Sequence, residues 1–250
     1  MIVALLLQAA VALPAQPGGP SPYPDAKAAG DWPGKGPIRH FGWMEANRKS
    51  FWAAREADQG KIIFAGDSLI GGWKLQKDFA GKPVANRGIG GDVTRGLLFR
   101  FQEDVLDLHP KAIVLHIGGN DLSADGSVAD VVSNYNAILD LAGKANPDLP
   151  IIVLAVLPHG IPTGDKAPNP SLAAYLKKVN ARIPVLNGQL AAMAQARKNV
   201  TFLDSYTLFL LPDGTIDTSQ FNADQVHPTD AGHAKLGKLV NEALVKLKLP

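Results

Sequence analysis

Four short motifs in this sequence carry residue types that together could hydrolyse an ester. They are GDSL at residues 66–69, NRGIGGD at 86–92, GGND at 118–121 and DQVH at 224–227. Ester hydrolysis through a covalent intermediate needs a hydroxyl nucleophile, a base, a group that orients the base, and donors for the developing oxyanion. The motifs contain a group for each of these roles.

Ser68 is the predicted nucleophile, because a serine hydroxyl becomes reactive when a base lies beside it. His227 can be that base, since an imidazole titrates near neutral pH and can both take and return a proton. Asp224 lies three residues earlier, close enough to fold back and fix the tautomer of the ring. A turn position without chemistry is the alternative for Ser68.

Three groups are candidates for the oxyanion hole: the backbone N–H groups of Ser68 and Gly91 and the side-chain amide of Asn120. A glycine at 91 suits this role because a residue without Cβ lets the backbone approach a ligand closely. Asn120 could instead cap the following helix. The stretch GIGGDV lacks the third glycine of a dinucleotide-binding loop, so a nucleotide is not expected.

His159 follows a predicted strand in a Pro- and Gly-rich stretch, so we expect it to border the pocket and contact substrate. His233 with His227 and Asp224 would be an alternative set of metal ligands, but the triad already uses two of the three. We therefore expect no metal and no cofactor.

The remaining polar residues near the motifs are expected to have no chemical role. These are a turn for Asp67, a cap or turn for Asp121, a satisfied core position for His116, and structural or solvated positions for His109 and His233.

Five short apolar segments predict the strands that position these motifs: residues 61–65, 83–86, 112–117, 151–157 and 200–203. Nearly continuous Ile, Val and Leu are typical of strands buried on both faces of a parallel sheet. Apolar residues at helical spacing predict helices over about 97–105 and 172–193 and after Thr229, the expected N-cap of the last helix. Pro184 should kink or split the second of these, and a further helix is expected over 43–57.

Alternating strands and helices indicate an α/β fold, a three-layer α/β/α sandwich around a five-stranded parallel sheet. In such sheets, ligands bind beyond the carboxyl ends of the strands. The first three motifs directly follow predicted strands, and the fourth precedes the last helix. The topology therefore predicts that they meet at one edge of the sheet.

The motifs resemble those of the SGNH hydrolases, also called GDSL esterases and lipases, over about residues 60–248. The resemblance implies a flavodoxin-like sandwich and places the family's Ser, Gly, Asn and His on Ser68, Gly91, Asn120 and His227, with Asp224 completing the triad. The stretches NRGIGGDVTRGLLFR and FLDSYTLFLLPDGTI are most similar to platelet-activating-factor acetylhydrolase catalytic subunits and to bacterial relatives that include carbohydrate O-acetylesterases.

This resemblance implies a serine esterase for short acyl groups, with acetyl groups on carbohydrate as the expected substrate. A lysophospholipase or arylesterase and a non-catalytic binding module on the same fold are the alternatives. The formal net charge is only +2 in 250 residues, with no run of Lys or Arg, so nucleic acid and anionic membranes are poor partners. Cys is absent, which excludes disulfides and a cysteine nucleophile.

The N-terminus predicts export to a secreted or periplasmic location. Residues 2–13 are apolar except for Gln8, are too few to span a bilayer comfortably, and are followed by a small residue at Ala15. We interpret 1–15 as a signal peptide, 16–38 as a Pro- and Gly-rich tether without regular structure, and 39–250 as the catalytic domain. The missing basic residue before the apolar run leaves a buried N-terminal helix as the alternative.

Overall fold

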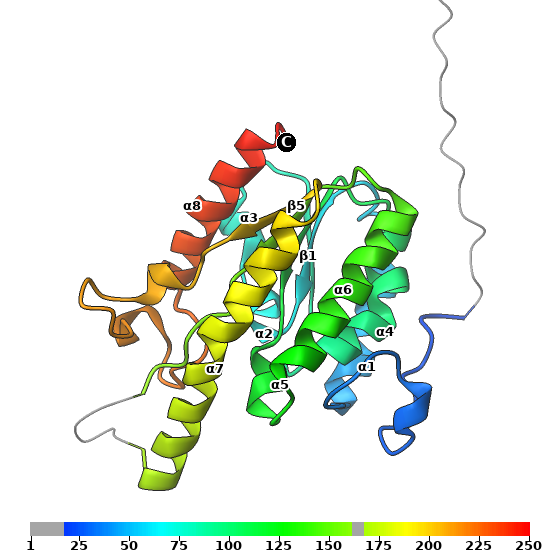
Figure 1. The fold of residues 1–250 in the computed structure, drawn as a ribbon. Helices are drawn as coiled ribbons and strands as arrows, with labels where there is room; N and C mark the ends of the chain where they lie inside the picture. The colour runs from blue at the N-terminus through cyan, green and yellow to red at the C-terminus, as the bar shows by residue number, and fades with distance from the viewer. Residues whose placement is uncertain (1–17, 162–167) are drawn as a thin grey trace, which may run out of the picture.

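The computed structural model describes residues 18–161 and 168–250 and is built around a five-stranded sheet (Figure 1). The strands are β1 (Ile62–Gly66), β2 (Val84–Gly88), β3 (Ala112–His116), β4 (Ile151–Leu154) and β5 (Val200–Leu203). They are arranged in the order β2-β1-β3-β4-β5, and every neighbouring pair is parallel. The predicted parallel sheet is confirmed.

Helices cover both faces of the sheet and confirm the predicted three-layer sandwich (Figure 1). The longer helices are α1 (Gly42–Ala54), α4 (Thr94–Asp104), α6 (Val128–Ala145), α7 (Pro170–Gln195) and α8 (Asp230–Lys246). Short helices are α2 (Ser68–Gly71), α3 (Leu75–Asp78) and α5 (Gly119–Ser123), with 3₁₀ turns η1 (Ala29–Asp31), η2 (Leu106–Leu108), η4 (Thr207–Phe209) and η5 (Thr218–Gln220).

Each face of the sheet has its own core, because successive side chains of a strand point to opposite faces. Ile113 and Leu115 of β3 pack with residues of α4, α6 and α7. Val114, between them, packs instead with residues of α3 and α8. Strands β1, β3 and β4 are buried on both faces, as their continuous apolar sequences predicted, whereas the edge strand β5 is partly exposed.

Two strands end earlier than predicted because side chains take over the hydrogen bonds of the backbone. The N–H of Ile117, one residue beyond β3, donates to the hydroxyl of Tyr135 at 3.2 Å. The N–H of Val156, two residues beyond β4, donates to Oδ1 of Asn187 at 2.8 Å. The segments after these strands therefore leave the sheet while remaining buried.

The helix predictions are confirmed for the most part. Thr229 is the N-cap of α8 and accepts from the N–H of Gly232 at 3.1 Å. Pro184 lies inside α7 and does not split it, since Ile183 and Leu186 on the core side remain fully buried and hold both halves against the sheet.

The N-terminal segment differs from its prediction. The expected signal peptide, residues 1–15, lies outside the described residues. The described part of the predicted tether, residues 18–38, has no regular structure apart from the 3₁₀ turn η1, as expected, but it packs on the domain. Tyr23 and Trp32 are buried, stack on each other at 5.5 Å between ring centroids, and form a small core with Met44. Burial of these aromatic side chains stabilises the packed position of an otherwise irregular segment.

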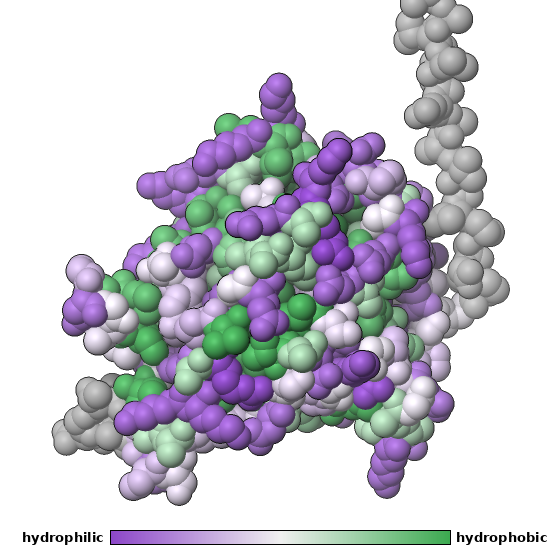
Figure 2. Space-filling model, in the orientation of Figure 1, coloured by the Kyte–Doolittle hydropathy of each residue, from purple (hydrophilic) through white to green (hydrophobic). Residues whose placement is uncertain are grey.

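Figure 2 shows hydrophilic residues over much of the face that carries α6 and α7, with apolar residues gathered near its centre. Within residues 18–161 and 168–250, no helix combines the length and the apolar character needed to cross a bilayer.

Candidate active site

The turn after β1 presents Ser68 at the carboxyl edge of the sheet. Asp67 caps the short helix α2, and its Oδ1 accepts from the N–H of Leu69 at 2.9 Å, which is the turn role predicted for it. The turn packs tightly, because a Cβ on Gly66 would lie 1.9 Å from the backbone oxygen of His116. Ser68 is thereby fixed as the first residue of α2, with a half-buried side chain.

His227 and Asp224 reach Ser68 from the loop before α8. The Nε2 of His227 lies 2.8 Å from the Ser68 Oγ, and its Nδ1 lies 2.8 Å from the Asp224 Oδ2. The other oxygen of Asp224 accepts from the backbone N–H groups of Val226 and His227. The structure thus joins the three side chains by hydrogen bonds, although Ser68 and His227 are 159 positions apart in the sequence.

Asp224 is held in its ionised form. Partial burial disfavours the charge, but the two backbone donors and the His227 ring outweigh it and lower the pKa of this carboxyl. An ionised acceptor at Nδ1 requires a proton on that nitrogen, which leaves Nε2 free to accept from the Ser68 hydroxyl.

The predicted oxyanion donors lie on the neighbouring loops. Gly91 follows β2 with a φ of +81°, which favours glycine, and a Cβ there would come within 3.0 Å of the ring of Phe41. Within the described chain, the backbone N–H groups of Ser68 and Gly91 donate no hydrogen bond to protein. They remain available for a ligand.

Asn120 lies inside α5 and does not cap it, because the N-cap is Gly118. Its Nδ2 donates to the backbone oxygen of Asp92 at 3.0 Å, and its Oδ1 accepts from Arg39 Nη1 at 2.9 Å. These two bonds fix the plane of the amide and leave one amide hydrogen for a ligand.

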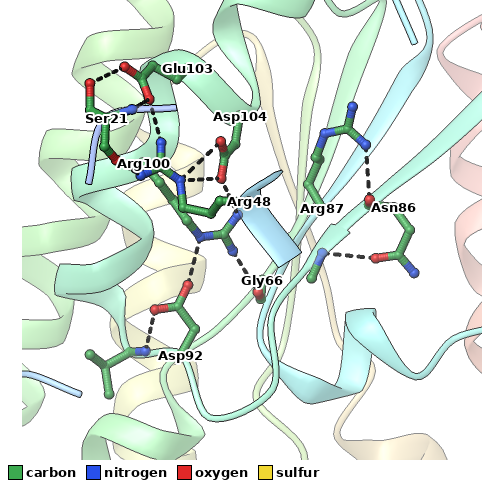
Figure 3. A network of polar contacts seen from close by, with 11 residues as sticks. Ser21, Arg48, Gly66, Asn86, Arg87, Asp92, Arg100, Glu103 and Asp104 are labelled. Carbon is green, nitrogen blue, oxygen red and sulfur yellow. Dashed lines mark hydrogen bonds and ion pairs between the residues drawn. The ribbon is translucent and has the colours of Figure 1, made fainter. Parts of the chain in front are cut away.

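A buried network of ion pairs and hydrogen bonds connects these loops (Figure 3). The Arg100 side chain donates from Nε to Asp92 Oδ2 at 2.9 Å and from Nη2 to the backbone oxygen of Gly66 at 3.0 Å. It also pairs with Asp104, which in turn pairs with Arg48. One guanidinium therefore ties the loop that carries Gly91 to the turn that carries Ser68.

Two carboxyl groups of this region are so deeply buried that their acidity changes. Burial raises the pKa of Asp92 to about 6, against the opposing effect of Arg100. Burial also raises the pKa of Asp121 to about 7, although the hydroxyl and N–H of Thr94 both donate to it. Asp121 therefore anchors the start of α4, in keeping with its predicted structural role.

A cavity of about 230 Å³ opens beside the Ser68 side chain. Residues that line it include Ser68, His116, Asn120, Leu157, His159 and Tyr175. His159 borders this cavity, as predicted, and burial lowers the pKa of its imidazole. Its backbone is clamped by Asn180, whose side chain both donates to and accepts from it.

His116 is buried as predicted but is not satisfied. Neither ring nitrogen has a hydrogen-bond partner among residues 18–161 and 168–250, and its Nδ1 lies 3.8 Å from Asp67 Oδ1. The Nε2 of His233 donates to the backbone oxygen of Leu69 at 3.2 Å, and its ring stacks on Trp73, which is a structural role. No group of three potential metal-binding side chains is found in the part of the chain that the structure describes.

Sequence reasoning missed Arg39, Asp92 and Arg100 as parts of the site. Arg39 is a single basic residue next to a Pro- and Gly-rich stretch, and nothing in its neighbours points to a contact with residue 120. The Asp92 and Arg100 pair joins a loop residue just before α4 to a residue inside that helix eight positions later, a spacing that gives no local signal in the sequence.

Comparisons with known proteins agree with this geometry. A sequence profile described as the GDSL-like Lipase/Acylhydrolase family matches residues 58–235. The human platelet-activating factor acetylhydrolase IB subunit alpha2 is 29% identical over 210 residues, which cover 82% of this chain and 84% of that protein.

Solved structures show the same fold. One from Streptococcus pneumonia, whose description names a platelet activating factor, superposes with a TM-score of 0.66 at 26% identity, over 81% of this chain and 94% of that one. An acetyl-xylooligosaccharide esterase from Geobacillus superposes with a TM-score of 0.56 at 21% identity, over 74% of this chain and 94% of that one, and shows likeness of fold alone.

Proposed function

The chain belongs to the GDSL-like lipase/acylhydrolase family and is a carboxylic ester hydrolase, and on this premise we propose that it is a serine esterase that releases short acyl groups through an acyl-enzyme intermediate. The observation that carries the proposal is the chain of hydrogen bonds from Asp224 through His227 to Ser68, with both distances at 2.8 Å. This arrangement supplies a nucleophile, its base and the orienting carboxylate.

In the first half of the proposed reaction, His227 Nε2 takes the proton of the Ser68 hydroxyl as its oxygen attacks the ester carbonyl. The negative charge that develops on the carbonyl oxygen is held by the N–H groups of Ser68 and Gly91 and by the free amide hydrogen of Asn120. Asp224 stabilises the imidazolium that forms. His227 then gives its proton to the leaving alcohol, and the acyl group stays on Ser68.

In the second half, His227 removes a proton from a water molecule, which attacks the acyl-enzyme carbonyl. The same donors hold the second oxyanion. The bond between the acyl carbon and the Ser68 oxygen breaks, the serine regains its proton from His227, and the carboxylic acid leaves. Each step uses groups of this chain, the substrate and one water molecule.

Acetyl is the acyl group that we propose. The cavity beside Ser68 measures about 230 Å³ and is lined by Leu157, His159 and Tyr175, which suits a short acyl group. His159 would contact the substrate there. The name of the human relative, an acetylhydrolase, points the same way. We propose acetyl groups on carbohydrate as the substrate, with an acetylated phospholipid as the second candidate, favoured by that same relative.

The decisive experiment compares wild type with Ser68→Ala on p-nitrophenyl acetate. We expect the variant to lose nearly all turnover, and a series from acetate to octanoate to show a steep fall in rate with acyl length. Ser133→Ala, an exposed serine on α6, is the matched control and should behave as wild type. Equal rates for wild type and Ser68→Ala would refute the assignment and favour a non-catalytic module.

We also propose that the protein is exported, with a signal peptide over 1–15, and that residues 39–250 form the catalytic domain, against which residues 18–38 pack. The apolar run over 2–13 and the small residue at Ala15 support this. Sequencing the N-terminus of the mature protein from an exporting host tests it: cleavage near residue 15 is expected, and an intact Met1 on exported protein would contradict it.

A further inference from the structure

Two aromatic side chains remain exposed at the edge of the candidate site. Trp43 is 53% exposed and Phe41 37% exposed, and their rings are stacked, with 4.5 Å between centroids and 15° between planes. We call this the aromatic pair. Exposed apolar groups that cluster in this way mark binding surfaces more often than isolated ones do.

The aromatic pair is held rigidly against the loop that carries Gly91. The indole Nε1 of Trp43 donates to the backbone oxygen of Gly90 at 2.8 Å, and the Phe41 ring covers the position where a Gly91 Cβ would lie. A Cβ on Gly90 would be 3.9 Å from Trp43 Nε1 and 4.0 Å from the Ser68 Cβ. The indole edge and the nucleophile therefore border the same small space.

Arg39 adds polar donors on the same side. Phe41 has extended backbone, with φ −118° and ψ 148°, and Arg39 lies two residues before it. His40, between them, lies against Tyr23 and Glu45. Arg39 lines the cavity and uses Nη1 on Asn120, which leaves other N–H groups of its guanidinium for a ligand.

We propose that the aromatic pair and Arg39 form a subsite for the sugar ring that carries the ester, an inference that rests on the proposed esterase function. A pyranose has a face of C–H groups that packs on a flat aromatic ring and a rim of hydroxyls that accept from a guanidinium. The chemistry of the subsite matches both features. A rigid aromatic surface also binds at low entropic cost, because little side-chain freedom is lost.

A lipid chain fits these observations less well. Lipid recognition needs a continuous apolar surface, whereas here a charged, five-donor side chain lies beside the rings and the indole is fixed by a polar bond. Residues 39–43 also lie before the segment that the family profile matches, residues 58–235, so this surface is supplied by a separate part of the chain.

Binding without catalysis is the first test. The Ser68→Ala protein is titrated calorimetrically with xylotetraose, cellotetraose and chitotetraose. We expect at least one to bind, and Trp43→Ala in the same background to weaken that binding about threefold to tenfold, the range for loss of one aromatic contact. Trp52→Ala, a tryptophan farther along α1, is the control and should bind as before. Absence of binding to all three sugars, or equal binding by both tryptophan variants, would overturn the proposal.

Kinetics form the second test, with acetylated xylotetraose compared with ethyl acetate, which has no ring. Trp43→Ala should lower kcat/KM for the sugar ester about threefold to tenfold more than for ethyl acetate, mainly through KM. Trp43→Phe keeps a ring face and should retain most of the wild-type preference for the sugar ester over ethyl acetate. Equal losses of kcat/KM on both esters would mean that Trp43 only supports Gly90. Binding to phosphatidylcholine vesicles is measured in parallel, and a loss confined to these vesicles would assign Trp43 to lipid binding. Either result overturns the sugar subsite. Failure of the esterase proposal itself has a separate signature, equal hydrolysis by wild type and Ser68→Ala.

Discussion

Arg39 and Asn120 are joined by a hydrogen bond of 2.9 Å from the guanidinium to the amide oxygen, while the amide nitrogen donates to Asp92. The amide is therefore held at both ends. A cationic donor on its oxygen also polarises it, which makes its remaining N–H a stronger donor. In the proposed oxyanion hole, Arg39 would therefore act through Asn120, as a positioning residue.

Asn120→Ala should lower kcat for p-nitrophenyl acetate by about 10²–10³, the usual effect of losing one oxyanion donor. Arg39→Met should lower it by about tenfold, since it removes one charge-assisted bond and leaves the donor in place. In the double variant the Arg39 effect should vanish, because its target is gone. Fully additive losses in this cycle would show that Arg39 acts independently of Asn120.

Asp224→Asn should lower kcat by about 10⁴, since a neutral amide favours the wrong tautomer of His227. The folded structure should persist, because the amide oxygen can still accept from the N–H groups of Val226 and His227. Circular dichroism checks the fold, and the exposed Asp213→Asn serves as control. A loss below tenfold with an intact fold would argue against the triad.

Gly88→Ala should destabilise the protein by about 3 kcal/mol, because its Cβ would lie 2.1 Å from the backbone nitrogen of Gly71 and push α2 off β2. Gly143→Ala is the matched control. Nothing lies within 4 Å of a Cβ there, so this change within α6 should raise the free energy of unfolding by about 0.5–1 kcal/mol. Urea unfolding measures both, and a stable Gly88→Ala protein would contradict the close approach of these two backbones.

Asp121 should make the protein less stable as pH rises between about 4 and about 7. Its pKa is about 7 in the folded protein and 3.8 in the reference state, so the native state binds more protons in this window. Stability that protonation supplies is therefore present at low pH and is lost as pH increases through the folded pKa.

Asp121→Asn should remove this part of the pH dependence, which amounts to about a few kcal/mol in the free energy of unfolding between about pH 4 and about pH 7. The measurement is the free energy of unfolding in urea at several pH values, taken as the difference between variant and wild type. The exposed Asp148→Asn should leave the wild-type slope unchanged. A difference that stays constant with pH would show that Asp121 is ionised throughout the window.

The strands and most helices could be predicted because their signals are local. Residues 112–117 read as a buried strand, and β3 covers Ala112–His116. The end points could not be predicted, since they depend on partners distant in sequence, such as Tyr135 for Ile117. The same holds for α6, which was not identified although Ser127 caps it and Val131, Tyr135 and Ile138 repeat at helical spacing.

The residues of the candidate site also fall into those that local sequence signals indicated and those that depend on partners distant in sequence. Ser68 and His227 could be assigned to one place because both flank elements whose carboxyl edge is shared in a parallel sheet. Arg39 could not, since its contact with Asn120 spans 81 positions and depends on how residues 18–38 pack. Residues 18–38 pack on the domain because Tyr23 and Trp32 are buried there, which the Pro and Gly content of the segment did not indicate.

The shared guanidinium of Arg100 has a consequence for how such an enzyme can diverge. Because one buried side chain binds both Gly66 and Asp92, a substitution that moves the turn of Ser68 also strains the loop of Gly91. Change is tolerated more readily at the rim, where the exposed Trp43 contacts that loop through the backbone of Gly90. New leaving-group preferences can arise there while the reactive centre stays as it is.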